Sequence, residues 1–333
     1  MAKTILITGA SGFIGSFIVE EALRLKYNVW AGIRTTSNRK YLKHKKLHFL
    51  ELDFAHPSAL RTQLAGYKGT YSKFDYIVHC AGITKAARHK DFDQVNFLQT
   101  KCFVDTLREL NMIPRQFIYL SSLSVYGPIH KQNDKPISEN DNPFPDTWYG
   151  MSKLKAELYI RSISGFPYVI LRPTGVYGPR EQDYYILAKS IKRHVDLSVG
   201  FRKQALTFVY VKDVVSAVFR CIEKDIYRRC YFLADGDVHD SRDFSRLIRK
   251  ELGNPLVLHI RIPLWLVRIV ASLNVLLSRK PTTLNPDKYK ILRQRNWRCD
   301  ITPAQRELEY EPAYTLAEGV AETIKWYKEE GWL

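Results

Sequence analysis

The chain has few cysteines and no long uncharged apolar run, and each shortage excludes a class of protein. Its five cysteines show no paired spacing of the kind that binds a metal, so we expect reduced, buried thiols in a cytoplasmic protein. No apolar stretch is long enough to cross a membrane without a charge. The nearest, Ile262 to Leu277, is interrupted by Arg268 and predicts either a core helix or the wall of a pocket. A position on a membrane surface is its less favoured alternative.

Acidic residues are also scarce. The chain has 34 Asp and Glu against 51 Lys and Arg, a formal net charge of +17, which favours anionic partners. No nucleic-acid-binding motif, repeat or low-complexity tract is present, so we expect no nucleic-acid partner and mostly solvated surface charge. Residues 241–300 are one exception, with 13 Lys and Arg against 4 Asp and Glu. The basic side chains of this segment could contact an anionic substrate, an acidic membrane surface or water alone, and water is favoured for most of them.

A glycine-rich turn lies close to the N-terminus. Met1-Ala-Lys leads directly into the apolar run Ile5–Ile7, which predicts a buried parallel strand and no signal peptide. Apolar residues then recur at helical spacing. A tight turn that lets the backbone approach a pyrophosphate needs glycine, so the spacing G-x-x-G-x-x-G predicts a dinucleotide site rather than an ordinary strand–helix turn. The candidate residues are Gly9, Ser11, Gly12, Phe13, Ile14 and Gly15.

Apolar runs and helical patterns alternate beyond this turn. Repeated alternation predicts an α/β fold with a doubly wound parallel (Rossmann) sheet. We expect residues 1–172 to form an NAD(P)-binding Rossmann domain, rejoined by about 209–234, and residues 173–333 to form a smaller C-terminal substrate domain. The further strands are expected at residues 29–33, 47–52, 76–79 and 117–120, and helices at 59–70 and 92–111.

The residue after the second predicted strand bears on which cofactor binds. Enzymes that prefer NAD usually carry an acid here, which binds the adenosine ribose and repels a 2′-phosphate. This chain has Arg34, followed by hydroxyl and basic side chains up to Lys40. That cluster attracts a phosphate, so we expect NADP, with NAD less favoured. A solvated basic loop is the alternative interpretation.

Further cofactor contacts are expected after the third and fourth strands. Asp53, followed by Phe54, could accept a hydrogen bond from the adenine amino group. The small residues Cys80, Ala81 and Gly82 would let a cofactor lie against the backbone. All five are therefore candidate cofactor-binding residues.

Tyr149 and Lys153 lie four residues apart at a predicted helix start, and hence on one helical face. A phenol with a pKa near ~10 is a poor acid or base at neutral pH, but a lysine ammonium one turn away stabilises the phenolate and lowers that pKa. The tyrosine can then exchange a proton with a substrate oxygen while hydride moves to or from nicotinamide. Two other Y-x-x-x-K patterns, beginning at Tyr41 and Tyr185, are interpreted as surface coincidences.

Together these motifs resemble the extended short-chain dehydrogenase/reductases, the NAD-dependent epimerase/dehydratase superfamily. The resemblance covers nearly the whole chain. It rests on Gly9, Gly12, Gly15, Asp53, His79 to Gly82, Asn96, Ser121 to Gly127, Tyr149, Lys153, Leu171 to Arg180 and Phe208 to Asp213.

The resemblance implies roles for particular residues. By the family pattern Ser122 is the catalytic serine, in preference to Ser121 and Ser124. Tyr149 becomes the acid/base, and Lys153 becomes both its pKa modifier and a ribose ligand. The residues that would border the nicotinamide are Pro173, Thr174, Gly175 and Val176.

Departures from the family pattern narrow the activity. Sugar 4,6-dehydratases carry an Asp-Glu pair directly after the catalytic serine or threonine, but Leu123 and Ser124 stand here, which excludes that activity. Nucleotide-sugar epimerases often carry Arg-Asp where this chain has Leu206 and Thr207, and this difference weakens the case for a nucleotide-sugar substrate. The remaining candidates for binding a diphosphate are Arg202, Lys203, Arg293, Arg295 and Arg298.

The C-terminal third is most similar to the branch of dihydroflavonol reductases and 3β-hydroxysteroid dehydrogenases. The resemblance implies an NADP-dependent oxidoreductase acting on a secondary alcohol or ketone of a bulky cyclic substrate, with no metal. It also implies a homodimer formed through the helices that begin near Asp93 and Tyr149. Two alternatives stay open: a nucleotide-sugar epimerase or ketoreductase, and a redox sensor that binds NADP without turnover.

Overall fold

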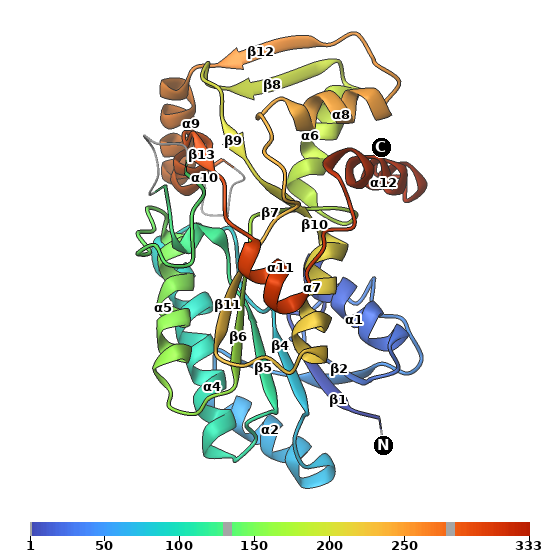
Figure 1. Cartoon of the computed structure of the whole chain (residues 1–333), viewed down its shortest axis with the longest axis vertical. Coiled ribbons are helices and arrows are strands. Elements are labelled where there is room, and N and C mark those ends of the chain that lie inside the picture. The colour runs from blue at the N-terminus through green and yellow to red at the C-terminus, as the bar shows by residue number, and fades with distance from the viewer. Residues whose placement is uncertain (1, 129–134, 278–283) are drawn as a thin grey trace.

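The fold is built on a seven-stranded sheet in which every strand pair is parallel (Figure 1). The computed structural model describes residues 2–128, 135–277 and 284–333. The strand order is β11-β6-β5-β4-β1-β2-β3, so the chain adds strands on one side of β1 and then, from β4 on, on the other side. This change of side between β1 and β4 confirms the predicted doubly wound sheet. The strands are β1 (Thr4–Thr8), β2 (Asn28–Ile33), β3 (His48–Glu51), β4 (Tyr76–His79), β5 (Gln116–Leu120), β6 (Tyr168–Pro173) and β11 (Arg229–Leu233).

Helices cover both faces of the sheet, so its strands are apolar on both sides. In β1, Ile5 and Ile7 enter one core and Leu6 enters the other. The first core is closed by α1 (Phe13–Arg24), α7 (Val211–Glu223) and α11 (Thr302–Leu308). The second is closed by α2 (Pro57–Tyr71), α4 (Gln99–Glu109) and α5 (Trp148–Ser162).

The helix predicted at residues 92–111 is one helical stretch with a change of winding. It begins as α3 (His89–Phe92), widens into the π-helix η1 (Asp93–Leu98) and continues as α4. Such π-segments are frequent at functional sites, and η1 carries the fully buried Asn96.

The rest of the chain lies beyond the carboxyl ends of the strands, in the upper part of Figure 1. Three two-stranded parallel pairs are formed there, and the chain returns to the central sheet at β11. The division into residues 1–172 and 173–333 stays a prediction. The elements of this part are β7 (Gly175–Tyr177), α6 (Gln182–Lys192), β8 (Val195–Val199), β9 (Ala205–Leu206), β10 (Phe208–Tyr210), α8 (Asp243–Glu251), β12 (Leu258–Ile262), α9 (Leu264–Leu277), α10 (Pro286–Leu292), β13 (Asn296–Trp297) and α12 (Leu316–Glu329).

Of the two alternatives predicted for Ile262 to Leu277, the core helix is wrong, whereas the wall of a pocket is found at Pro263 to Trp265. The segment forms the end of β12 and then α9, but only Val267 and Ala271 of α9 are buried among its described side chains. Helical periodicity showed apolar residues on most sides, and it could not show that α9 lies at the edge of the molecule. In the described part of the chain, no helix is both long and apolar enough to cross a membrane.

Candidate active site

The glycine turn is folded so tightly that it excludes side chains. Gly9 has a φ of +66°, and a Cβ there would lie 2.8 Å from the backbone nitrogen of Ala81. A Cβ at Gly15 would lie 2.2 Å from the carbonyl oxygen of Gly9. These two glycines therefore bring the start of α1 against the end of β1, and bring both against the loop after β4.

The N-terminus of α1 fits the pyrophosphate of a dinucleotide. Gly12 is the N-cap residue, the first turn holds no acid, and no side chain in the described chain caps the helix. The unpaired N–H groups and the positive end of the helix dipole favour an anion there. Ser11 precedes the cap, and Phe13 and Ile14 open the helix, so the predicted turn residues lie together.

The loop after β4 is fixed by Asn96, which the sequence analysis matched to the family without giving it a role. The Asn96 side chain accepts from the Ile83 N–H at 2.8 Å and donates to the Ile83 carbonyl at 3.0 Å. It also donates to the Ser152 hydroxyl on α5 at 3.0 Å. A Cβ on Gly82 would lie 3.4 Å from the Lys153 ammonium, so Asn96 holds this loop beside the candidate catalytic helix.

The start of α5 packs against the segment that carries Ser122. The Thr147 side chain accepts from the Gly150 N–H at 3.0 Å and caps the helix. A Cβ on Gly150 would lie 2.3 Å from the Ser124 carbonyl oxygen, so only glycine permits this approach. As a result the Ser122 hydroxyl lies near enough to the Tyr149 phenol to lower the pKa of Tyr149. The Ser122 Oγ also accepts from the Ser124 N–H at 3.1 Å.

Lys153 lies one helical turn after Tyr149 on α5. Its side chain is buried, and its ammonium donates to the Leu120 carbonyl at 2.8 Å and sits 4.7 Å from the centre of the Tyr119 ring. An ammonium has three protons, so two remain for other acceptors. The hydroxyls of a nicotinamide ribose fit that capacity.

The expected lowering of the Tyr149 pKa is not found. Burial raises the pKa of Tyr149 to about 12, and the nearby Ser122 hydroxyl opposes this only in part. Burial also lowers the pKa of Lys153 to about 8. Desolvation is therefore the main cause of the Tyr149 shift, the Lys153 charge is not among its causes, and Tyr149 is a neutral phenol at neutral pH.

The predicted adenosine-binding residues follow β2 and β3. Arg34 is exposed, and its N–H donates to the Ser37 hydroxyl in a turn. The Asp53 carboxylate accepts from the Ala55 N–H at 3.0 Å and pairs with His56 at 2.8 Å, which lowers the Asp53 pKa. The Phe54 ring packs edge-on to His79, so Phe54 also belongs to the core.

The segment predicted to border the nicotinamide leads from β6 into β7. Pro173 ends β6, and Gly175 and Val176 pair with β10. The Thr174 hydroxyl donates to the Thr207 carbonyl at 2.7 Å. Thr207 donates in turn to the Trp297 carbonyl at 2.7 Å. Thr207 stands where nucleotide-sugar epimerases often carry the Asp of an Arg-Asp pair, and in this chain it has a structural role.

The C-terminal third makes contacts to the site that were not predicted from the sequence. The Asp287 carboxylate on α10 accepts from the Tyr149 N–H at 3.0 Å. Asp183 forms ion pairs with both Lys85, in the loop after β4, and Lys288 on α10. No local pattern marks these residues, because their partners lie 98 to 138 positions away in the chain.

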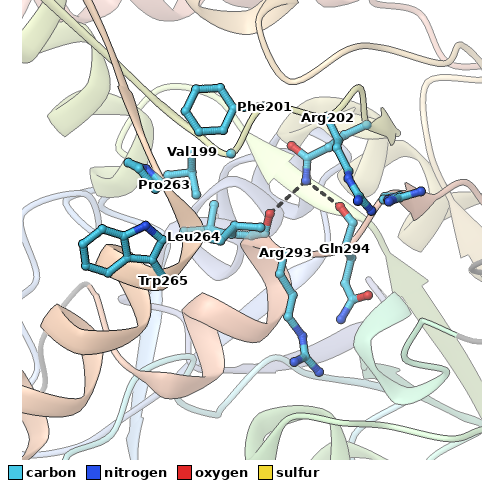
Figure 2. Close-up of a pocket in the computed structure, with 12 residues that line it drawn as sticks. Val199, Phe201, Arg202, Pro263, Leu264, Trp265, Arg293 and Gln294 are labelled. Atoms are coloured by element: carbon cyan, nitrogen blue, oxygen red, sulfur yellow. Dashed lines mark hydrogen bonds between the residues drawn. The ribbon is translucent and has the colours of Figure 1, made fainter.

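A pocket of about 440 Å³ lies at the far end of α10 from Tyr149. Figure 2 shows apolar side chains on one side of it and Arg202, Arg293 and Gln294 on the other. α10 has seven residues and so spans about 10 Å, which separates this pocket from Tyr149. The apolar side is formed by Val199, Phe201, Pro263, Leu264 and Trp265.

Comparison with known proteins agrees with this arrangement. The model of the NAD dependent epimerase/dehydratase family matches residues 5–229, and the chain belongs to that family. The predicted family is confirmed, and so is the prediction of an NAD(P)-dependent enzyme, an oxidoreductase or epimerase.

Individual relatives are distant but match over almost their whole length. UDP-glucose 4-epimerase of Vibrio cholerae is 24% identical, over 98% of this chain and 95% of its own. 3-beta-hydroxysteroid dehydrogenase of Mycolicibacterium neoaurum is 24% identical, over 97% of this chain and 91% of its own. The crystal structure of UDP-glucuronic acid 4-epimerase from Bacillus cereus with NAD superposes with a TM-score of 0.76 at 21% identity, over 98% and 99%.

Proposed function

We propose that the protein is an NADP-dependent oxidoreductase that interconverts a ketone and a secondary alcohol on a bulky cyclic substrate. The observation that carries this proposal is the placement of the Ser122 hydroxyl near enough to the Tyr149 phenol to lower its pKa, at the start of the helix that carries the buried Lys153. Because burial keeps Tyr149 protonated at neutral pH, its phenol can donate a proton to a carbonyl oxygen. Reduction of a ketone needs a proton at that atom.

The three side chains divide the work. Bound nicotinamide supplies or accepts hydride. Ser122 holds the substrate oxygen, and Tyr149 gives it a proton in reduction or takes one in oxidation. Lys153 keeps a positive charge near the tyrosinate that forms, and its two remaining protons would bind the ribose hydroxyls of the cofactor. A pKa of about 8 leaves Lys153 mostly charged at neutral pH.

The preference for NADP rests on Arg34. It is exposed at the end of β2, and its guanidinium forms no ion pair with any other described residue. We expect wild type to bind NADP at least about tenfold more tightly than NAD, since a charge-assisted contact to a phosphate is worth about 1.5–3 kcal/mol. Titration of both cofactors against wild type and Arg34→Asp tests this, with the exposed Lys45→Asp as the control for lost charge. Equal affinities in wild type would contradict the preference.

The bulky cyclic substrate is supported by the similarity to a 3-beta-hydroxysteroid dehydrogenase. The apolar side of the pocket, about 10 Å from Tyr149, would hold only the end of such a substrate that is remote from the reacting oxygen. The test is a panel of steroids, flavonoids, simple ketones and nucleotide sugars, with NADPH absorbance as the readout. We expect stoichiometric NADPH oxidation with a bulky cyclic ketone. NADPH consumption with small ketones alone would overturn the substrate class.

A nucleotide-sugar epimerase or ketoreductase is the second candidate. Arg202, Arg293 and Arg295 line the other side of the same pocket, where they could bind a diphosphate. An epimerase returns the hydride to its own substrate, so it would convert a nucleotide sugar without net change in NADPH. Chromatography of the sugar products separates the two candidates. The cytoplasmic location and the homodimer stay predictions.

A further inference from the structure

The β8–β12 pair turns its apolar face toward solvent. Along β12, Leu258 is 65% exposed and Ile260 is 40% exposed, and Leu197 on β8, the register partner of Ile260, is 44% exposed. The opposite face carries Asp196, which is buried and pairs with His259. Strand residues two apart share a face, so the exposed apolar residues of β12 lie together on one face, and His259 and Arg261 on its other face are exposed as well.

α9 continues this apolar face. Val267 and Ala271 anchor the helix, while large apolar side chains cover an arc of about 140° on its outer side at 100° per residue. The exposed apolar residues are Trp265 (62%), Leu266 (37%), Ile269 (48%), Val270 (45%) and Leu273 (47%).

The two parts form one surface, which we call the α9 face. Val199 and Phe201 at the end of β8 line the same pocket as Pro263 to Trp265 at the start of α9 (Figure 2). In Figure 1, α9 lies directly beside the ends of β8 and β12. Phe201 is itself 66% exposed. Apolar patches of this extent mark interaction sites on proteins.

Basic side chains border the α9 face. Residues 195–205 and 256–274 contain Arg202, Lys203, Arg261 and Arg268, and their single acid, Asp196, is buried. Arg293 and Arg295 add two further cations at the pocket. A hollow lined by Arg202, Lys203 and Arg261 also contains Asp240, which is paired with Arg242.

We propose that the α9 face docks the protein onto an anionic phospholipid surface. A helix with an apolar face and flanking cations lies in the plane of the interface, and tryptophan favours the headgroup level. A second copy of the chain suits the face less well, because a two-fold interface would set the same cations against each other. The net charge of +17 adds attraction to acidic lipid.

Vesicle co-sedimentation of the full chain tests the proposal. Vesicles of phosphatidylcholine alone are compared with vesicles in which about a third of the lipid is phosphatidylglycerol. Wild type is expected to bind the anionic vesicles and to be released by high salt. Trp265→Ser with Ile269→Ser is expected to weaken binding more than about tenfold, because it removes the apolar contact. Arg261→Gln with Arg268→Gln is expected to weaken it about 25-fold, at about fivefold for each basic residue.

Matched variants elsewhere on the surface serve as controls. Tyr71→Ser removes an exposed aromatic residue on α2, at the opposite end of the molecule in Figure 1, and should leave binding unchanged. Lys45→Gln with Lys46→Gln removes two exposed charges from the β2–β3 loop, which contacts the end of the chain at Trp326 and Glu330, and should have little effect.

Three results would overturn the proposal. Wild type could stay in the supernatant with anionic vesicles at low salt, or the α9 variants could bind as well as wild type. The third result concerns a second copy: sedimentation velocity could show an oligomer that Trp265→Ser with Ile269→Ser dissociates, in a protein that binds no vesicles.

Discussion

Arg172 and Glu157 form an ion pair enclosed between β6 and α5. Their closest atoms, Nη2 and Oε2, lie 2.7 Å apart, and the side chains are 2% and 0% exposed. Arg172 also donates to the Tyr126 hydroxyl at 3.2 Å. Lys153 lies one turn before Glu157 and Tyr149 lies two turns before it, so this pair attaches the candidate catalytic helix to the sheet.

Removing one partner of this pair should be costly. Glu157→Ala leaves the Arg172 charge buried without compensation, and we expect the free energy of unfolding to fall by about 3–5 kcal/mol. Urea denaturation followed by circular dichroism measures the change. Glu109→Ala, which breaks the exposed pair with Arg61, is the control and should be close to wild type. Equal, small effects of the two variants would contradict an anchoring role.

A second prediction compares a glycine of the turn with a glycine on the surface of α2. Gly15→Ala forces a Cβ to within 2.2 Å of the Gly9 carbonyl, so we expect a loss of about 1–3 kcal/mol in stability and a large loss of cofactor affinity. Gly66→Ala on α2 meets nothing within 4 Å and should stabilise the protein by about 0.5–1 kcal/mol. Thermal unfolding with and without NAD(P) distinguishes the two. Unchanged cofactor binding by Gly15→Ala would argue against the turn as the pyrophosphate site.

The features that were predictable from sequence are those that local pattern determines. The run Ile5–Ile7, the glycine spacing and the strand ends follow from short-range rules, and the parallel sheet follows from their alternation. The hydrogen bond from the Tyr149 N–H to Asp287 was not predictable, because it joins residues 138 positions apart.

Two further predictions were wrong for the same physical reason, because both concern how deeply a side chain is buried. The Y-x-x-x-K spacing placed Lys153 near Tyr149 in sequence but could not show how far each side chain is desolvated. The direction of the Tyr149 pKa shift was therefore wrong. In α9 the apolar pattern was correct, but which neighbours cover Trp265 and Ile269 is decided by tertiary packing.

The lowered pKa of Lys153 makes stability depend on pH. The folded value is about 8, whereas a lysine in the unfolded chain titrates near ~10.4. Between these values the unfolded chain binds more protons, so the free energy of unfolding rises with pH. Relative to Lys153→Met, wild type should gain about 2–3 kcal/mol from about pH 8 to about pH 10.

Urea denaturation across this pH range, with wild type and Lys153→Met side by side, measures that gain. The exposed Lys155→Met on the same helix is the control, and its difference from wild type should stay constant. A constant difference for Lys153→Met as well would contradict a buried lysine with a lowered pKa.

The role of Tyr149 can be separated from its surroundings with a second tyrosine. Tyr149→Phe keeps the ring and removes the proton that the substrate oxygen needs, so kcat should fall by about 10²–10⁴-fold while cofactor affinity stays near wild type. Tyr185→Phe removes the hydroxyl of the Y-x-x-x-K pattern on α6, whose ring packs on Tyr327 and Trp332, and should leave kcat unchanged. The measurement is steady-state turnover of the substrate that the panel identifies, with NADP binding by fluorescence as the second readout. Tyr149→Phe with wild-type kcat would remove Tyr149 as the acid/base, whereas a loss of both kcat and cofactor binding would point to a structural role.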